Sequence, residues 1–214
     1  MALKKDLTKG NLNKQIFLFA LPIVASNLFQ ALYNAVDMYF VGKYMGTAAT
    51  AAVSVGGPVM NILLMAVSGM ALGVTILLGS LTGINDTERI KKTANTAISI
   101  FISAAVIITL LGILFSPFIL KIIYTPPEAF PLAVTYLRIV FAGMVFTLGY
   151  NLVCAIQRGF GDSKSSMYFV MAATATNVVL DYLLIAKFNM GVSGAALARI
   201  ASQALSFVLS IVEF

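Results

Sequence analysis

Long apolar runs separated by short polar connectors organise this chain. A helix needs roughly 20 apolar residues to cross the hydrocarbon core of a bilayer. Six runs reach about that length, namely 16–40, 48–81, 93–119, 131–156, 167–186 and 192–214. The second is long enough to tilt or to kink at Pro58. The pattern predicts an all-α integral membrane protein, with an amino-terminal segment 1–15 followed by six transmembrane helices in 16–214.

Composition supports a membrane protein and excludes a soluble domain. Hydrophobic residues make up 60% of the 214 residues, whereas charged residues make up only 10%. Soluble domains carry about 25% charged residues. The net charge of +6 comes from basic residues spread between the apolar runs. We therefore expect the lipid bilayer as the surroundings of the chain and no nucleic acid partner.

The placement of Lys and Arg predicts the orientation. If the amino terminus is cytoplasmic, the inner segments hold nine basic residues: Lys4, Lys5, Lys9, Lys14, Arg89, Lys91, Lys92, Arg158 and Lys164. The outer loops then hold three, which are Lys43, Lys121 and Lys187. Loops that stay inside the cell are richer in basic residues. We predict that both ends of the chain are cytoplasmic.

Polar side chains form narrow seams along three of the predicted helices. At about 100° per residue, the seam of helix 16–40 spans about 80° and that of helix 167–186 about 60°. The seam of helix 48–81 recurs every seven residues. Such seams face a bundle interior or a water-filled cavity, because lipid cannot satisfy their hydrogen bonds. Their members are Asn27, Gln30, Asn34 and Asp37; Thr174, Asn177 and Asp181; and Ser54, Asn61, Ser68 and Thr75.

Close packing between helices is the alternative explanation of these seams. Small residues let neighbouring helices approach in a membrane. We favour this explanation for helix 48–81, which also carries Gly56, Gly57, Gly69 and Gly73.

Asp37 and Asp181 are the strongest functional candidates. A carboxylate in hydrocarbon is costly and is rarely kept without a use. Asn34 and Asn177 lie three and four residues before the two acids, so each pair shares one helix face. Low dielectric favours the neutral acid, whereas a bound Na⁺ or a donating amide favours the charged form. We predict a proton or cation site in the outer third of the membrane. The sequence does not distinguish between H⁺ and Na⁺ as the bound ion.

Two arginines lie inside the predicted helices. Arg138 is near a helix end, where it is expected to extend toward water. Arg199 lies about two turns into helix 192–214, at a depth from which it can reach Asp181. Such a pair would hold Asp181 ionised and weaken its case as a proton carrier.

Several motifs, in order along the chain, resemble those of the multidrug and toxic compound extrusion (MATE) transporters, and most closely the bacterial DNA-damage-inducible F type branch. They are LP at 21–22, QALYNAVD at 30–37, VG at 41–42 with Gly46, YLRI at 136–139, RGFGD at 158–162, NVVLD at 177–181 and GAALA at 194–198. The resemblance implies one half of a fold in which two six-helix lobes enclose a cavity of alternating access. This chain matches the amino-terminal lobe, so a carboxyl-terminal lobe is missing from it.

The resemblance also implies roles for individual residues. Asp37 and Asp181 take the place of the coupling acids, with Asn177 beside them, and Tyr33 and Asn151 fall where members line the polar cavity. Many members carry Thr where this chain has Arg199, which puts the usual coupling chemistry in question. Members export cationic, amphipathic drugs and dyes in exchange for H⁺ or Na⁺.

We therefore predict a secondary active antiporter that exports small organic cations across a bacterial inner membrane, and not an enzyme. The coupling site comprises Asp37, Asp181, Asn177 and Asn34, and a Na⁺ ion would bind at Asp37, Asn177 and Asp181. Further cavity residues are Tyr33, Asn151, Gln30 and Arg199. No cofactor is expected beyond the coupling ion, and the protein partner is a carboxyl-terminal lobe or a second copy.

Two alternatives remain. A lipid-linked precursor flippase of the same wider superfamily would need a cationic cavity, for which Arg138 and Arg199 are the available residues. A membrane scaffold, or an enzyme acting on lipids, ranks lower. The sequence has no His and one Cys, and so lacks a clear nucleophile–base set or metal cluster.

Overall fold

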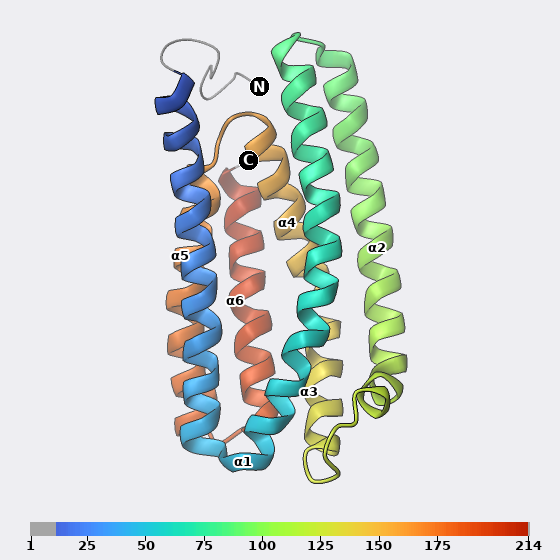
Figure 1. Cartoon of the computed structure of the whole chain (residues 1–214), viewed down its shortest axis with the longest axis vertical. Coiled ribbons are helices and arrows are strands. Elements are labelled where there is room, and N and C mark those ends of the chain that lie inside the picture. The colour runs from blue at the N-terminus through green and yellow to red at the C-terminus, as the bar shows by residue number, and fades with distance from the viewer. Residues whose placement is uncertain (1–11, 214) are drawn as a thin grey trace.

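The computed structural model describes residues 12–213, which form a bundle of long helices joined by short turns (Figure 1). The helices run roughly parallel to the long axis of the bundle, and α1 begins at the same end of it as α6 finishes. The elements are α1 (Leu12–Gly83), α2 (Thr87–Ile122), α3 (Phe130–Ala142), α4 (Met144–Gly159), α5 (Lys164–Asp181), a π-helix (Tyr182–Lys187) and α6 (Gly191–Glu213).

Helix α1 crosses the bundle twice because it reverses at Gly46. Gly46 has φ 79° and ψ −177° and is the one residue within α1 with a non-helical backbone. This region of conformational space is essentially reserved for glycine. The prediction of a connector over residues 41–47 is therefore wrong, since helical backbone continues up to a single reversing residue. Pro58 also causes no break in the helical backbone.

Replacing Gly46 with alanine is expected to destabilise the protein by about 1–3 kcal/mol, the typical cost of a strained backbone residue. A Cβ atom at Gly46 would meet no other atom within 4 Å, so the cost comes from the backbone alone. Gly69→Ala is the matched control, because Gly69 is helical and also has open space around it. Thermal unfolding in detergent measures both. An equal, small effect of the two substitutions would contradict this account of the turn.

The remaining crossings come from α2, the bent pair of α3 and α4, α5 with the π-helix that follows it, and α6. Helices α3 and α4 join at Gly143 with a bend of 45° and together make one span. Helix α5 continues directly into the π-helix, so Lys164–Lys187 makes another. With the two passes of α1, the described residues make six crossings. The six-helix, all-α fold class is confirmed.

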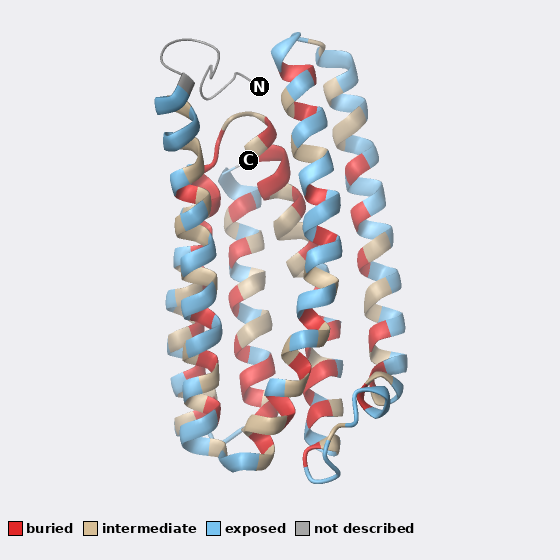
Figure 2. Cartoon of the chain, viewed as in Figure 1, coloured by how far each residue is buried: buried red, intermediate tan, exposed pale blue. Residues whose placement is uncertain are grey.

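The core is made where the second pass of α1 meets α3 and α4, with α2 packed on α3 and α4. Gly159 on α4 approaches α1 so closely that a Cβ atom would lie 2.8 Å from Leu78. One turn away, the Thr75 hydroxyl donates to the Ala155 carbonyl at 3.0 Å, which links the same two helices. Figure 2 shows buried positions turned toward the bundle and exposed positions turned outward. Many of the exposed side chains are large and apolar, as a lipid-facing surface requires.

The packing explanation of the second seam is confirmed for part of it only. Thr75 and Gly56 do lie at helix contacts. The side chains of Ser54, Asn61 and Ser68 are exposed instead. A Cβ atom would meet nothing within 4 Å at three of the four glycines, namely Gly57, Gly69 and Gly73. The second pass of α1 therefore presents an open polar and glycine-rich face that this lobe does not cover.

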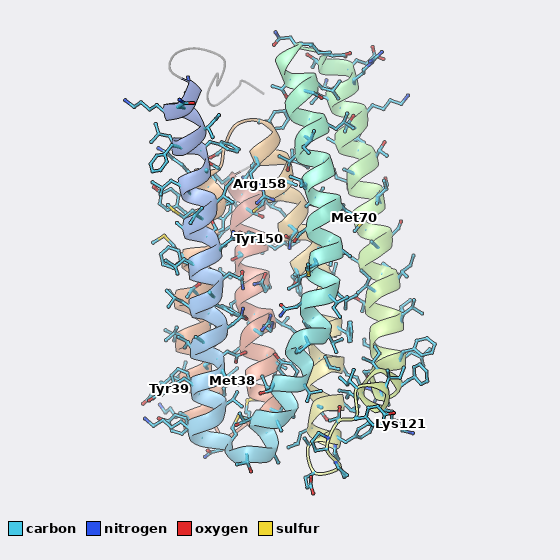
Figure 3. The ribbon with its side chains drawn as sticks, viewed as in Figure 1. Met38, Tyr39, Met70, Lys121, Tyr150 and Arg158 are labelled. Atoms are coloured by element: carbon cyan, nitrogen blue, oxygen red, sulfur yellow. The ribbon has the colours of Figure 1, made fainter. Side chains whose placement is uncertain are left out.

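The two ends of the bundle carry different groups of charged residues. Figure 3 places Lys121 at the same end of the bundle as Met38 and Tyr39, where α1 reverses, and Arg158 in the opposite half. Lys121, predicted for an outer loop, and Arg158, predicted for an inner segment, thus lie in opposite halves of the bundle. Lys4, Lys5 and Lys9 lie outside the described residues.

Candidate functional site

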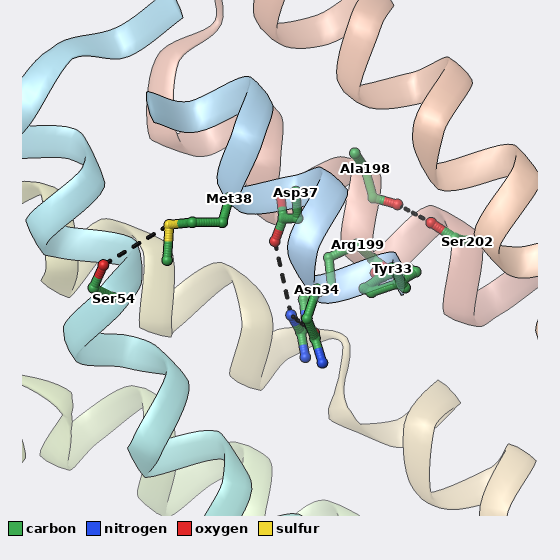
Figure 4. A network of polar contacts seen from close by, with 8 residues as sticks. All are labelled: Tyr33, Asn34, Asp37, Met38, Ser54, Ala198, Arg199 and Ser202. Atoms are coloured by element: carbon green, nitrogen blue, oxygen red, sulfur yellow. Dashed lines mark hydrogen bonds and ion pairs between the residues drawn. The ribbon is translucent and has the colours of Figure 1, made fainter. Parts of the chain in front are cut away.

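An ion pair between α1 and α6 lies at the centre of the site. Arg199 Nη1 lies 3.8 Å from Asp37 Oδ2, and the two side chains are 18% and 4% exposed. The same nitrogen donates to Asn34 Oδ1 at 3.4 Å. Figure 4 shows the guanidinium of Arg199 reaching from α6 to the face of α1 that carries Asn34 and Asp37. A single cationic group thus contacts both members of the first predicted pair.

Two tyrosines enclose the guanidinium of Arg199. The Tyr33 ring centroid lies 5.5 Å from Arg199 Cζ, a cation–π distance. The Tyr33 hydroxyl also donates to the Arg199 backbone carbonyl at 3.3 Å, which fixes α1 against α6. Tyr136 of α3 is buried, and its hydroxyl interacts with the guanidinium. Glycine at position 56 makes room for it, because a Cβ atom there would lie 2.9 Å from the Tyr136 ring.

A small cavity opens beside the ion pair. It has a volume of about 170 Å³ and lies between the two passes of α1, α3 and α6. Pockets for drug-sized molecules measure about 300–1,000 Å³. This cavity therefore suits a small ion or water and is too small for a drug. Its polar lining residues are Asn34, Asp37, Ser54, Asn61, Tyr136 and Arg199.

Asp181 and Asn177 lie on α5 and are completely buried. Neither the Asp181 carboxylate oxygens nor the Asn177 amide atoms have a hydrogen-bond partner among the described residues. Asp181 is within electrostatic range of both Asp37 and Arg199. Buried polar groups without partners are rare and call for a functional explanation. Asp181 and Asn177 are therefore a second group of candidate site residues, on α5.

A change of helix type occurs immediately after Asp181. The chain passes from α5 into the π-helix at Tyr182, and π-helical turns are frequent at functional sites. Helix α6 packs tightly against this turn, because a Cβ atom on Gly194 would lie 3.2 Å from the Leu184 carbonyl oxygen. The first glycine of the GAALA motif thus allows the approach that brings α6, and with it Arg199, close to Asp181.

One sequence prediction needs correction at this point, and two others stay open. Arg199 forms its ion pair with Asp37, not with Asp181, because α6 also packs against α1 and the side chain extends toward that helix. Asn151 lies outside the lining of this small cavity, and its amide donates to the Thr147 carbonyl of its own helix at 2.8 Å. Gln30 is half-buried and also lies outside the lining. That Asn151 and Gln30 line a larger substrate cavity stays a prediction.

Tyr136 is the site residue that sequence reasoning missed. It belongs to the YLRI motif, which served as a family marker only. A tyrosine inside an apolar run is an available signal, because its hydroxyl needs a polar partner when buried.

Comparison with known proteins identifies the family. The MatE family model matches residues 22–183. The chain belongs to this family. It is 32% identical over 203 residues to the probable multidrug resistance protein YpnP of Bacillus subtilis, covering 95% of this chain and 46% of that relative. It is 26% identical over 206 residues to the multidrug export protein MepA of Staphylococcus aureus, covering 96% of this chain and 46% of that protein.

Solved structures of MATE transporters share this fold. An outward-facing multidrug resistance MATE transporter has a TM-score of 0.88 at 26% identity, over 94% of this chain and 44% of that one. An inward-facing MATE structure has a TM-score of 0.80 at 26% identity, over 85% of this chain and 41% of that one.

A third neighbour is a Pyrococcus furiosus transporter of the same superfamily, described as having a binding pocket of reverse polarity that suggests a different function. Its TM-score is 0.89 at 26% identity, over 95% of this chain and 45% of that one. Across the comparisons, the chain spans about half the length of the relatives that it matches. The predicted resemblance to one MATE lobe is confirmed.

Proposed function

We propose that this chain forms the amino-terminal lobe of an antiporter that exports organic cations in exchange for H⁺ or Na⁺. The names of YpnP and MepA, which refer to multidrug resistance and export, support the export of drugs. The observation that carries the proposal is the presence of two buried acids, Asp37 and Asp181, inside the bundle of a MATE lobe. Buried acids within membrane-spanning helices typically serve ion or proton pathways.

Ion exchange at these acids provides the coupling. When the site opens to one side of the membrane, water reaches the carboxylates and favours their charged form. When the site closes, burial favours a neutral site, which takes up a proton or a cation. The ion and the substrate bind to different states of the bundle, and this links the transport of the ion to that of the substrate. Asn34 and Asn177 orient the acids or serve as oxygen ligands.

The substrate binds outside the small cavity, on the open face of α1. That face carries Asn61 and Ser68 together with Gly57 and Gly69, which have open space around them. We propose that a carboxyl-terminal lobe covers this face and that the drug lies between the lobes, where pockets commonly form. A second copy of the chain is the alternative cover. The distribution of Lys and Arg favours a cytoplasmic amino terminus. The family match and the bacterial relatives support a bacterial inner membrane location.

The flippase alternative is less well supported by the geometry. A flippase for anionic lipid-linked precursors needs free cationic groups in its cavity. Arg138 is exposed on the outside of α3, away from the cavity lining. Arg199 is already paired with Asp37. The described lobe therefore offers no unpaired cation among the residues that line this cavity.

Dye efflux from cells tests the proposed function. Cells of a pump-deficient host that express the full-length protein should extrude a cationic fluorescent dye. Extrusion should stop when ionophores collapse both the H⁺ and the Na⁺ gradient, while the ATP level is held constant. Cells with the empty vector are the control. Efflux that continues at the same rate without either gradient would rule out antiport.

A further inference from the structure

The guanidinium of Arg199 stands where a small cation would bind Asp37. It lies 3.8 Å from Asp37 Oδ2, contacts the Asn34 amide oxygen and faces the Tyr33 ring. Carboxylate and amide oxygens and an aromatic face are the groups that attract a cation. The chain thus supplies a cation of its own to one of the two acids.

We propose that Arg199 is a tethered cation that permanently occupies the position beside Asp37, so that Asp181 alone exchanges an ion, and that this ion is a proton. This inference rests on the proposed function. It divides the roles of the two acids, because Asp37 positions Arg199 and Asp181 carries the exchange.

The ligands around Asp181 favour a proton over Na⁺. Hard cations are held by several oxygen ligands at once. Asp181 offers two carboxylate oxygens and Asn177 one amide oxygen, and both side chains are completely buried. The positive charge of Arg199 within electrostatic range opposes a second fixed cation in this low-dielectric space. A proton needs only one carboxylate oxygen.

The charge of the site then changes by one unit during exchange. With Asp181 ionised, two carboxylates and one guanidinium give a net charge of −1. When a proton binds an Asp181 oxygen, the net charge becomes zero, and breaking that O–H bond restores the negative charge. The negative state attracts an organic cation from the adjoining face of α1, and the neutral state releases it. Proton and substrate therefore compete through charge without sharing one pocket.

Thermal unfolding of the purified full-length protein in Na⁺ or K⁺ tests the proposal. The wild-type Tm should be the same in both salts at equal ionic strength. Arg199→Thr removes the tethered cation and frees Asp37, so its Tm should rise with Na⁺ and not with K⁺, because an ion that binds the folded state stabilises it. Arg199→Lys keeps a tethered cation and should behave like the wild type. Arg138→Gln, which changes an exposed arginine, should also show no response to Na⁺.

A wild-type protein that Na⁺ stabilises as strongly as it stabilises Arg199→Thr would overturn the proposal. If Arg199→Thr does not fold, a wild-type Tm that is higher in Na⁺ than in K⁺ overturns the proposal by itself. The measurement also needs no transport. If the protein exports no dye, the proposed function fails, whereas a Na⁺ response of the wild type rejects only the tethered-cation site.

Discussion

Asp181→Asn is expected to abolish drug resistance without loss of folded protein. The substitution keeps the shape of the side chain and removes its ability to exchange a proton. Asp181 is completely buried and its carboxylate oxygens have no partner among the described residues. An ionised carboxylate without a partner is costly in such a place, so Asn should leave the Tm unchanged or raise it. Coupling between two binding sites typically changes affinity about 5–150-fold. We expect the substrate affinity of the wild type to change with pH by a factor in this range, and that of Asp181→Asn not to change with pH.

Growth of a pump-deficient host on a cationic drug measures the effect. The expression level and Tm of the variant are measured in parallel. Arg138→Gln is the matched control and should retain resistance, because Arg138 is exposed and lies outside the cavity. Resistance equal to the wild type at equal expression of Asp181→Asn would exclude Asp181 as the coupling acid.

Asp37→Asn is expected to act mainly through stability. It leaves the Arg199 guanidinium without its counter-ion, in a side chain that is 18% exposed. Removing one partner of a buried ion pair typically costs about 3–5 kcal/mol, and the partial exposure places this pair at about 3 kcal/mol. The Tm of Asp37→Asn should therefore fall, whereas that of Asp181→Asn should not.

A double-mutant cycle separates the pair from its surroundings. Asp37→Asn with Arg199→Gln removes both charges, so the double variant should regain most of the stability that Asp37→Asn loses. The pair Asp181→Asn with Arg199→Gln is the matched comparison. It should show a smaller coupling energy, because Arg199 forms its ion pair with Asp37. A larger coupling energy for Asp181 with Arg199 than for Asp37 with Arg199 would mean that Arg199 pairs with Asp181.

The helix pattern and the burial of the two acids inside the bundle could be read from the sequence. Six apolar runs matched six crossings, because each crossing needs a set length of apolar helix. The burial of Asp37 and Asp181 followed from the cost of exposing a carboxylate to lipid. The hydrophobic pattern predicts a loop over residues 41–47 that is too long. The composition of this segment does not reveal that the chain reverses at Gly46 alone.

The contacts between helices could not be read in this way. Helical spacing indicates which residues share a face, but it does not say which helices are neighbours. Arg199 was therefore assigned to the nearer acid along the chain, whereas α6 packing against α1 brings it to Asp37. Tyr136 joined the site from α3 by the same kind of packing, beside the space that Gly56 leaves. The π-helix after Asp181 likewise has no signal in the hydrophobic pattern.

Uptake of a cationic dye by inside-out proteoliposomes with the full-length protein tests the central claim most directly. A pH gradient imposed without Na⁺ should drive uptake into vesicles with the wild type, and vesicles with Asp181→Asn should take up no more dye than protein-free vesicles. Equal uptake by the wild type and Asp181→Asn would contradict the account.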